Sequence, residues 1–211
     1  MSALIVNKTK KKEDIILAAL KVFAEKGLSN STIKEIADRA GIGKGTIYEY
    51  FKDKNEIIHS SFFYFQKFFE VDMENILLSK ENGASKLKNL MKSIMSITKS
   101  DNKEYLDLMF DFWAEGIKGH EKGVMLTEMN KFYKSYRKLF EDVLSEGIED
   151  GSIRKDIDPF ETSSIIIGTM DGIMVQWILD KEVIDLKKIE KNLINLILNG
   201  AGSQFNKQGG F

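Results

Sequence analysis

The sequence has no cysteine and a single proline, Pro159, in 211 residues. The lack of cysteine excludes disulfide scaffolds, thiol nucleophiles and cysteine-based metal sites, and it fits the reducing cytoplasm. The only histidines, His59 and His120, are too far apart in sequence for a zinc-binding HExxH motif. No Gly-x-Ser-x-Gly motif occurs either. We therefore expect a cytoplasmic protein that is not an enzyme and that uses no metal or cofactor.

Long uncharged segments are also missing from the chain. None reaches the roughly 18 residues that a membrane-spanning helix needs. The short apolar start at residues 3–6 precedes the lysines, whereas a secretory signal has its positive charges first. These absences predict a protein without a membrane partner.

Apolar residues recur at helical spacing, and the turns between them are marked by glycine and polar clusters. The predicted fold class is therefore all-α. About nine helices are expected, at residues 12–26, 32–40, 44–51, 54–78, 84–99, 103–118, 121–150, 159–180 and 185–203. Thr32 and Glu35 predict a capping box at the start of the second helix, and Asp158 followed by Pro159 predicts the start of the eighth.

The formal net charge of −1 conceals an uneven division along the chain. Residues 1–54 carry 11 basic and 7 acidic side chains, whereas residues 55–211 carry 20 basic and 25 acidic ones. We predict a basic arm and head at 1–54, a helical body at 55–203 and a flexible tail at 204–211. A basic end on an acidic body indicates an anionic partner for that end. The lysines at 8–12 fit either a disordered arm along phosphates or a solubilising tail.

The second and third predicted helices are joined by the turn at residues 40–43, Ala-Gly-Ile-Gly. This is the layout of a helix-turn-helix, whose second helix enters the major groove of DNA. Lys44 is long enough to reach a phosphate or a guanine edge, and Gly45 lets the backbone approach the groove. Thr46 adds a hydroxyl beside the unpaired amides of the first turn.

The third helix has one side suited to DNA and one suited to the core. Tyr48 lies four residues after Lys44 on the same face, and Ile47 with Phe51 forms a second pair that is expected to face the core. Spacing alone leaves an alternative open, a plain helical hairpin with a solvated lysine.

Three stretches decide between these alternatives: ILAALKVFAEKG at 16–27, STIKEIA at 31–37 and AGIGKGTIYEYFKDK at 40–54. Together they resemble the DNA-binding head of the TetR/AcrR family of bacterial transcriptional repressors, and the resemblance covers about residues 12–58. It implies a homodimer that binds a palindromic double-stranded DNA operator and is released by a small apolar or amphipathic effector.

The resemblance also implies which residues touch DNA. The positions that match the family's DNA contacts are Thr32, Lys34, Lys44, Gly45, Thr46, Tyr48, Tyr50 and Lys54. Two positions depart from the family pattern. Gly43 stands where a Ser or Thr usually caps the helix, and Glu49 places an acid near the DNA. Glu49 is expected to face solvent, with acceptance of a hydrogen bond from cytosine as the alternative.

Aromatic and methionine stripes occur on the middle and late helices. Taken alone they fit a hydrophobic core, but the resemblance implies an apolar effector pocket with a few polar groups. The candidate lining residues are Phe62, Phe65, Tyr105, Met109, Phe112, Trp113, Tyr136, Met170, Asp171, Met174 and Trp177. The candidate polar residues are Asp111, Asp171, Thr169, Gln176 and His120.

The last two predicted helices are apolar on more than one face. Such a helix needs a second partner besides its own core, which indicates a two-fold dimer interface. The candidate interface residues are Ile165, Gly168, Gly172, Gln176, Leu193 and Ile197.

The function that these features predict is a ligand-responsive transcriptional regulator, most simply a repressor. The alternative is a helix-turn-helix protein without an effector, whose body serves dimerisation or protein recruitment. A third possibility is a helical lipid carrier whose head does not bind DNA. Such a protein would not protect the DNA near its own gene.

Overall fold

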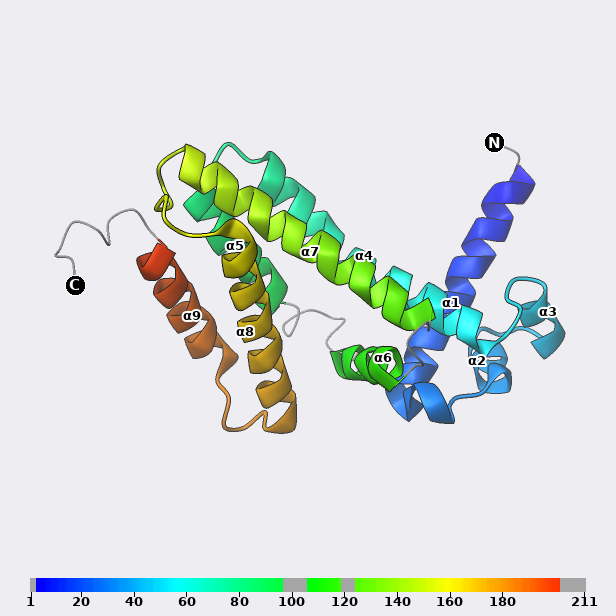
Figure 1. Ribbon diagram of the computed structural model, residues 1–211. Coiled ribbons are helices and arrows are strands. Elements are labelled where there is room, and N and C mark those ends of the chain that lie inside the picture. The colour runs from blue at the N-terminus through cyan, green and yellow to red at the C-terminus, as the bar shows by residue number, and fades with distance from the viewer. Residues whose placement is uncertain (1–2, 97–105, 119–123, 202–211) are drawn as a thin grey trace. The chain divides into compact units, whose positions relative to one another are not determined.

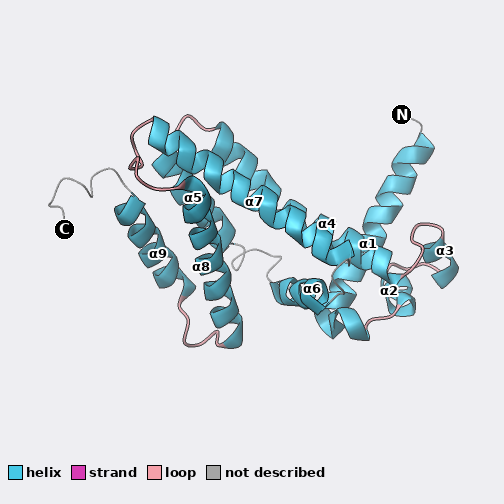
Figure 2. Cartoon of the chain, in the orientation of Figure 1, coloured by secondary structure: helices cyan, strands magenta, loops and turns pink. Residues whose placement is uncertain are grey.

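The computed structural model describes residues 3–96, 106–118 and 124–201, and within these ranges every regular element is a helix (Figures 1 and 2). The predicted all-α class is thereby confirmed. The helices are α1 (Ala3–Asn30), α2 (Ile33–Arg39), α3 (Lys44–Tyr48), α4 (Lys54–Leu78), α5 (Gly83–Met95), α6 (Leu106–Lys118), α7 (Val124–Glu149), α8 (Pro159–Leu179) and α9 (Leu186–Ala201).

Both predicted helix starts are present. The backbone amide of Glu35 donates to the Thr32 hydroxyl at 3.3 Å, and the Glu35 carboxylate accepts from the Thr32 amide at 2.9 Å. At α8, the Asp158 carboxylate accepts from the Glu161 amide at 2.8 Å, with Pro159 in the first turn. Each cap satisfies amides that the helix itself leaves unpaired.

The beginning of α1 differs from the expectation. The helix begins at Ala3 rather than near residue 12, so the lysines at 8–12 belong to α1, and a disordered arm, one of the two alternatives for them, is not what the structure shows. The reason is local, because no glycine or proline interrupts the sequence between Ala3 and Lys26. The ammonium of Lys12, on α1, lies 4.9 Å from the Phe51 ring centre and 3.9 Å from the Glu56 carboxylate.

The chain divides into two compact units. The first comprises residues 1–68 and 101–129, and it therefore joins α6 to the helix-turn-helix and to the first half of α4. Within it α1 packs against α2 and α6, and α2 packs against α3. Its fully buried side chains include Ile15, Leu20, Phe23, Ile36, Ile47, Phe51 and Phe112. Ile47 and Phe51 face the core, as their spacing predicts.

The second unit comprises residues 69–100 and 130–211. Its core draws on α5, α7, α8 and α9 and contains Leu87, Leu90, Met91, Phe140, Val143, Leu144, Ile166 and Met170. The start of α5 lies very close to the end of α7, since a Cβ on Gly83 would stand 2.3 Å from the Cα of Gly147. Beside this contact the buried Lys86 ammonium donates to the Glu146 carboxylate at 2.7 Å. The domain boundaries predicted at 54 and 203 stay predictions.

Helix α8 is unusual in composition. Among the described residues it is the one helix long and apolar enough to cross a membrane by length and composition alone, and 28% of the residues in that apolar window are buried. An apolar core helix of a soluble protein meets the same criterion. Its exposed apolar residues, which include Ile165 and Leu179, therefore need a structural explanation.

Candidate functional site

The predicted DNA-contacting residues at the start of α3 form an open surface. Lys44 and Gly45 are exposed, and Tyr48 keeps 49% of its surface in solvent although it is aromatic. A Cβ on Gly45 would meet no atom of the described chain within 4 Å. Nothing inside the protein requires glycine at that position, which fits a backbone that must approach an external partner closely. Thr46 is half-buried beside them.

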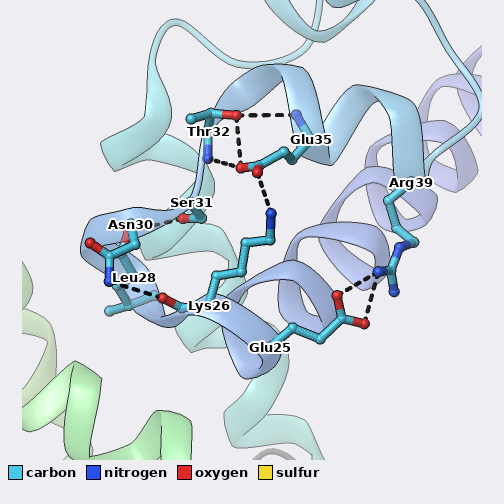
Figure 3. Close-up of polar contacts among 8 residues, drawn as sticks. All are labelled: Glu25, Lys26, Leu28, Asn30, Ser31, Thr32, Glu35 and Arg39. Atoms are coloured by element: carbon cyan, nitrogen blue, oxygen red, sulfur yellow. Dashed lines mark hydrogen bonds and ion pairs between the residues drawn. The ribbon is translucent and has the colours of Figure 1, made fainter.

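Thr32 caps the start of α2 (Figure 3), and Lys34 lies in the first turn of that helix. The Thr32 hydroxyl donates to the Glu35 carboxylate at 2.8 Å while accepting from the Glu35 amide, so its single donor is used within the chain. The Lys26 ammonium also contacts that carboxylate. Lys34 is exposed. Thr32 therefore shapes the start of α2, and Lys34 is the residue there whose side chain is available to a phosphate.

Glu35 contributes to stability in a pH-dependent way. Its hydrogen bonds, first from Lys26 and then from Thr32, lower its pKa from 4.5 to about 2. The contribution is therefore fully present above pH 4.5 and is lost as the pH falls towards 2. The predicted head is thus held by a charged network that stays intact at neutral pH.

Tyr50 and Lys54 stand at the other end of the predicted contact surface, and both are half-buried. The Lys54 ammonium donates to the Ser29 carbonyl oxygen at 3.1 Å, at the end of α1. Burial lowers the pKa of Lys54, and the negative charges of Glu115 and Glu35 oppose that change. Lys54 thus ties α4 to α1, in addition to its predicted role as a phosphate contact.

Four of the predicted effector-lining residues are described in the first unit. Phe112 of α6 is buried, and its ring meets that of Phe62 on α4 edge-on, at 5.2 Å between centroids. Met109 and Trp113 are half-buried neighbours of Phe112 on α6. The side chain of Phe65, together with Tyr105 and His120, lies outside the described residues.

The remaining candidates belong to the second unit. Tyr136 of α7 stacks on Phe132 at 5.6 Å, and the Tyr133 hydroxyl donates to the Asp171 carboxylate of α8 at 3.0 Å. Met170 and Met174 are buried in the same unit, and Trp177 is half-buried with the Lys181 ammonium 5.2 Å from its ring centre. Of the polar candidates, Asp171 is thus paired with a tyrosine, whereas Thr169 and Gln176 are exposed and donate to carbonyls of their own helix.

Burial of the Asp171 carboxylate lowers the stability of the folded protein at neutral pH. Burial raises its pKa from 3.8 to about 6, and the hydrogen bond from Tyr133 only partly offsets this effect. Between these two pH values the folded protein keeps a proton that the unfolded chain has lost, so stability falls as the pH rises through this window. At neutral pH the folded state holds a carboxylate that would be more stable in water.

We expect the replacement Asp171→Asn to raise the free energy of unfolding at pH 7 by about 1–3 kcal/mol, because the amide carries no charge and still accepts from Tyr133. Urea unfolding at pH 4 and pH 7 measures the effect, and the gain should be largest at pH 7. Equal stability of the two proteins at pH 7 would contradict the assignment of a buried, costly carboxylate.

The predicted dimer residues of α8 lie on one open strip. Ile165 is 62% exposed, Gly168 and Gln176 are exposed, and Gly172 is half-exposed. Cβ atoms on Gly168 and Gly172 would meet nothing within 4 Å. The spacing of these residues places them on one helical face. Leu179, 81% exposed, ends the helix.

The two candidates from α9 lie elsewhere. Leu193 is buried in the core of its own unit, and Ile197 packs against that core. The exposed apolar residue of α9 is Leu196, at 71%. Apolar residues cover several faces of this helix, so the sequence pattern alone does not single out Leu196 as the outward one.

No group of three or more potential metal ligands occurs among the described residues. The features that the structure offers are therefore an exposed basic helix end, aromatic and methionine residues on α6 to α8, and an open apolar strip on α8.

Known proteins share both the sequence and the fold. Residues 15–60 match the bacterial regulatory proteins of the tetR family, and residues 67–200 match the C-terminal region of YsiA-like proteins. The fatty acid metabolism regulator protein of Bacillus subtilis (strain 168) is 28% identical over 88% of this chain and 93% of its own. The HTH-type transcriptional repressor KstR2 of Rhodococcus jostii (strain RHA1) is 25% identical over 94% of this chain and 95% of its own.

A solved structure extends this likeness. The transcriptional regulator FadR of Bacillus subtilis, in complex with stearoyl-CoA, superposes with a TM-score of 0.74 at 28% identity and covers 89% of this chain and 98% of its own. The similarity therefore spans both the predicted head and the predicted body.

Proposed function

The chain belongs to the tetR family of bacterial regulatory proteins and is a ligand-responsive transcriptional repressor; we propose that it binds a palindromic DNA operator as a homodimer and that a long-chain acyl-CoA releases it. The observation that carries the effector class is the likeness to a regulator solved with stearoyl-CoA, which extends over 89% of this chain. The family is one of regulators, so a catalytic role is not part of the proposal. A cytoplasmic location follows from the DNA partner.

The apolar residues of the body fit an acyl chain. Met109, Phe112 and Trp113 lie within about one turn of α6, and Met170 and Met174 lie about one turn apart on α8. Aromatic and thioether side chains adapt to a flexible apolar ligand, and a small number of polar groups fixes its orientation. Asp171 with Tyr133 is the polar pair available for that role in the second unit.

A partner subunit explains the open strip of α8. Two glycines without an internal neighbour, set beside an exposed isoleucine, allow two helices to approach closely, and a two-fold axis makes the same strip serve both subunits. A two-fold dimer is also what a palindromic operator requires, since its half-sites are related by the same symmetry. The strip Ile165, Gly168, Gly172 and Gln176 is therefore proposed as the centre of the interface.

Footprinting on the DNA upstream of its own gene tests the proposal. We expect the protein to protect a palindromic segment, and stearoyl-CoA to raise the operator dissociation constant about 5- to 150-fold, the range of typical allosteric coupling. Stearate and coenzyme A, added separately, are the matched controls. Protection that persists at saturating stearoyl-CoA would remove the acyl-CoA effector, and the absence of any protected segment would remove self-regulation at this site.

A further inference from the structure

A hydrogen bond joins α6 to the turn between α1 and α2, and its two residues are 83 positions apart in the sequence. The carboxylate Oδ2 of Asp111 accepts from the backbone amide of Leu28 at 3.0 Å in a partly buried setting. Leu28 follows Gly27, where α1 kinks, and it precedes the α2 cap at Thr32 by four residues. Asp111 thus contacts the segment that leads directly into the helix-turn-helix.

The local backbone explains why an external acceptor is needed at this turn. Gly27 has φ 78° and ψ 161°, which interrupts the helix and takes the next amide out of the helical hydrogen-bond ladder. A partly buried amide without an acceptor is costly, and Asp111 supplies one. A Cβ on Gly27 would stand 3.2 Å from the same Oδ2, so glycine serves both the positive φ and the close approach of α6.

Two neighbouring residues of α6 interact with α4, one through its charge and one through its ring. Glu115 lies one turn after Asp111, and its charge acts on Lys54, whose ammonium donates to the Ser29 carbonyl oxygen. Phe112 meets Phe62 edge-on. Helix α6 therefore contacts the segment that enters the helix-turn-helix and the helix that leaves it, and Asp111 makes the direct hydrogen bond.

We infer that Asp111 is a positioning residue that couples the effector to DNA binding: its bond to the Leu28 amide keeps the head in the operator-competent arrangement, and effector binding along α6 breaks the bond. This inference rests on the proposed function, because Met109 and Trp113 on the same helix are the proposed effector contacts. Loss of the bond then shifts the population towards the released state before any effector is added.

The replacements Asp111→Ala and Asp111→Asn separate this role from general stability. Alanine removes the acceptor, whereas the asparagine amide oxygen retains it at nearly the same size. For Asp111→Ala we expect the operator dissociation constant to rise about 3- to 10-fold, with stearoyl-CoA adding a correspondingly smaller factor than in the wild type. The same population shift should make stearoyl-CoA bind the DNA-free Ala variant more tightly than it binds the wild type. The Asn variant should resemble the wild type in all three measurements.

Hydrogen exchange at the Leu28 amide reports on the bond directly and should accelerate in the Ala variant alone. Full-length homodimers are used throughout, with sedimentation and thermal unfolding as checks on assembly and fold. Accelerated exchange with unchanged operator affinity would overturn the inference, as would equal effects of Ala and Asn. A wild-type protein that ignores stearoyl-CoA would instead refute the proposed effector, and the operator affinities of the two variants would still decide the role of Asp111.

Discussion

Replacement of Lys44 by Ala is expected to weaken operator binding about tenfold or more while leaving the homodimer intact. Lys44 is exposed at the first turn of α3, and it has no ion-pair partner within the described part of the chain. A side chain that contacts a guanine edge in a bidentate manner contributes about 1–3 kcal/mol, and a lysine on a phosphate adds affinity for every DNA sequence. Tyr48→Ala should have a comparable effect, because its half-exposed ring lies one turn further along the same face.

Gel-shift titrations over a range of salt concentrations measure this effect. If Lys44 contacts a phosphate, its loss should reduce the slope of the logarithm of affinity against the logarithm of salt by about one. Lys88→Ala is the matched control, since Lys88 is also exposed, on α5 of the second unit. Lys44→Ala and Tyr48→Ala proteins that bind the operator as tightly as the wild type would remove α3 as the recognition helix.

The features that the sequence predicts correctly depend on near neighbours in the chain. The Thr32–Glu35 capping box and the Asp158 cap of α8 each involve residues three apart, so their geometry follows from the helix itself. The core position of Ile47 depends on helical spacing in the same way. The family resemblance in residues 12–58 then implies that this local structure binds DNA.

The features that the sequence did not predict depend on tertiary contacts. Nothing local to Asp111 indicates that it accepts from Leu28, and nothing local to Lys54 indicates the Ser29 carbonyl. The first contact arises because α6 packs against α1, although it follows α1 by more than 70 residues, and the second joins the start of α4 to the end of α1. Periodicity predicts that a side chain lies on an apolar or polar face, but not which distant backbone group it meets.

On helix α9, periodicity likewise does not predict which residues are available for a dimer interface. Leu193 and Leu196 are both leucines within one turn, yet the first is buried and the second is 71% exposed. Where apolar residues cover several faces, periodicity does not determine which face turns inward. On α8 the two glycines and their polar neighbours mark the open face, and the candidates there share one strip.

Replacement of Ile165 by Glu, on the open strip of α8, is expected to dissociate the homodimer. Ile165 is 62% exposed in the single chain, so the substitution should cost the folded monomer little. In a two-fold interface the same change introduces two carboxylates at related positions. Burying unpaired charges costs several kcal/mol, and about 4 kcal/mol corresponds to a thousandfold rise in the dimer dissociation constant.

Sedimentation velocity over a range of protein concentrations measures this change, and operator binding should fall with it because a monomer engages only one half-site. Leu78→Glu is the matched control, since Leu78 is 77% exposed at the end of α4 and lies off the strip. Circular dichroism checks that both variants stay folded. If Ile165→Glu and Leu78→Glu remain equally dimeric, the two-fold axis must lie away from the α8 strip, and Gly168 and Gly172 would need another partner.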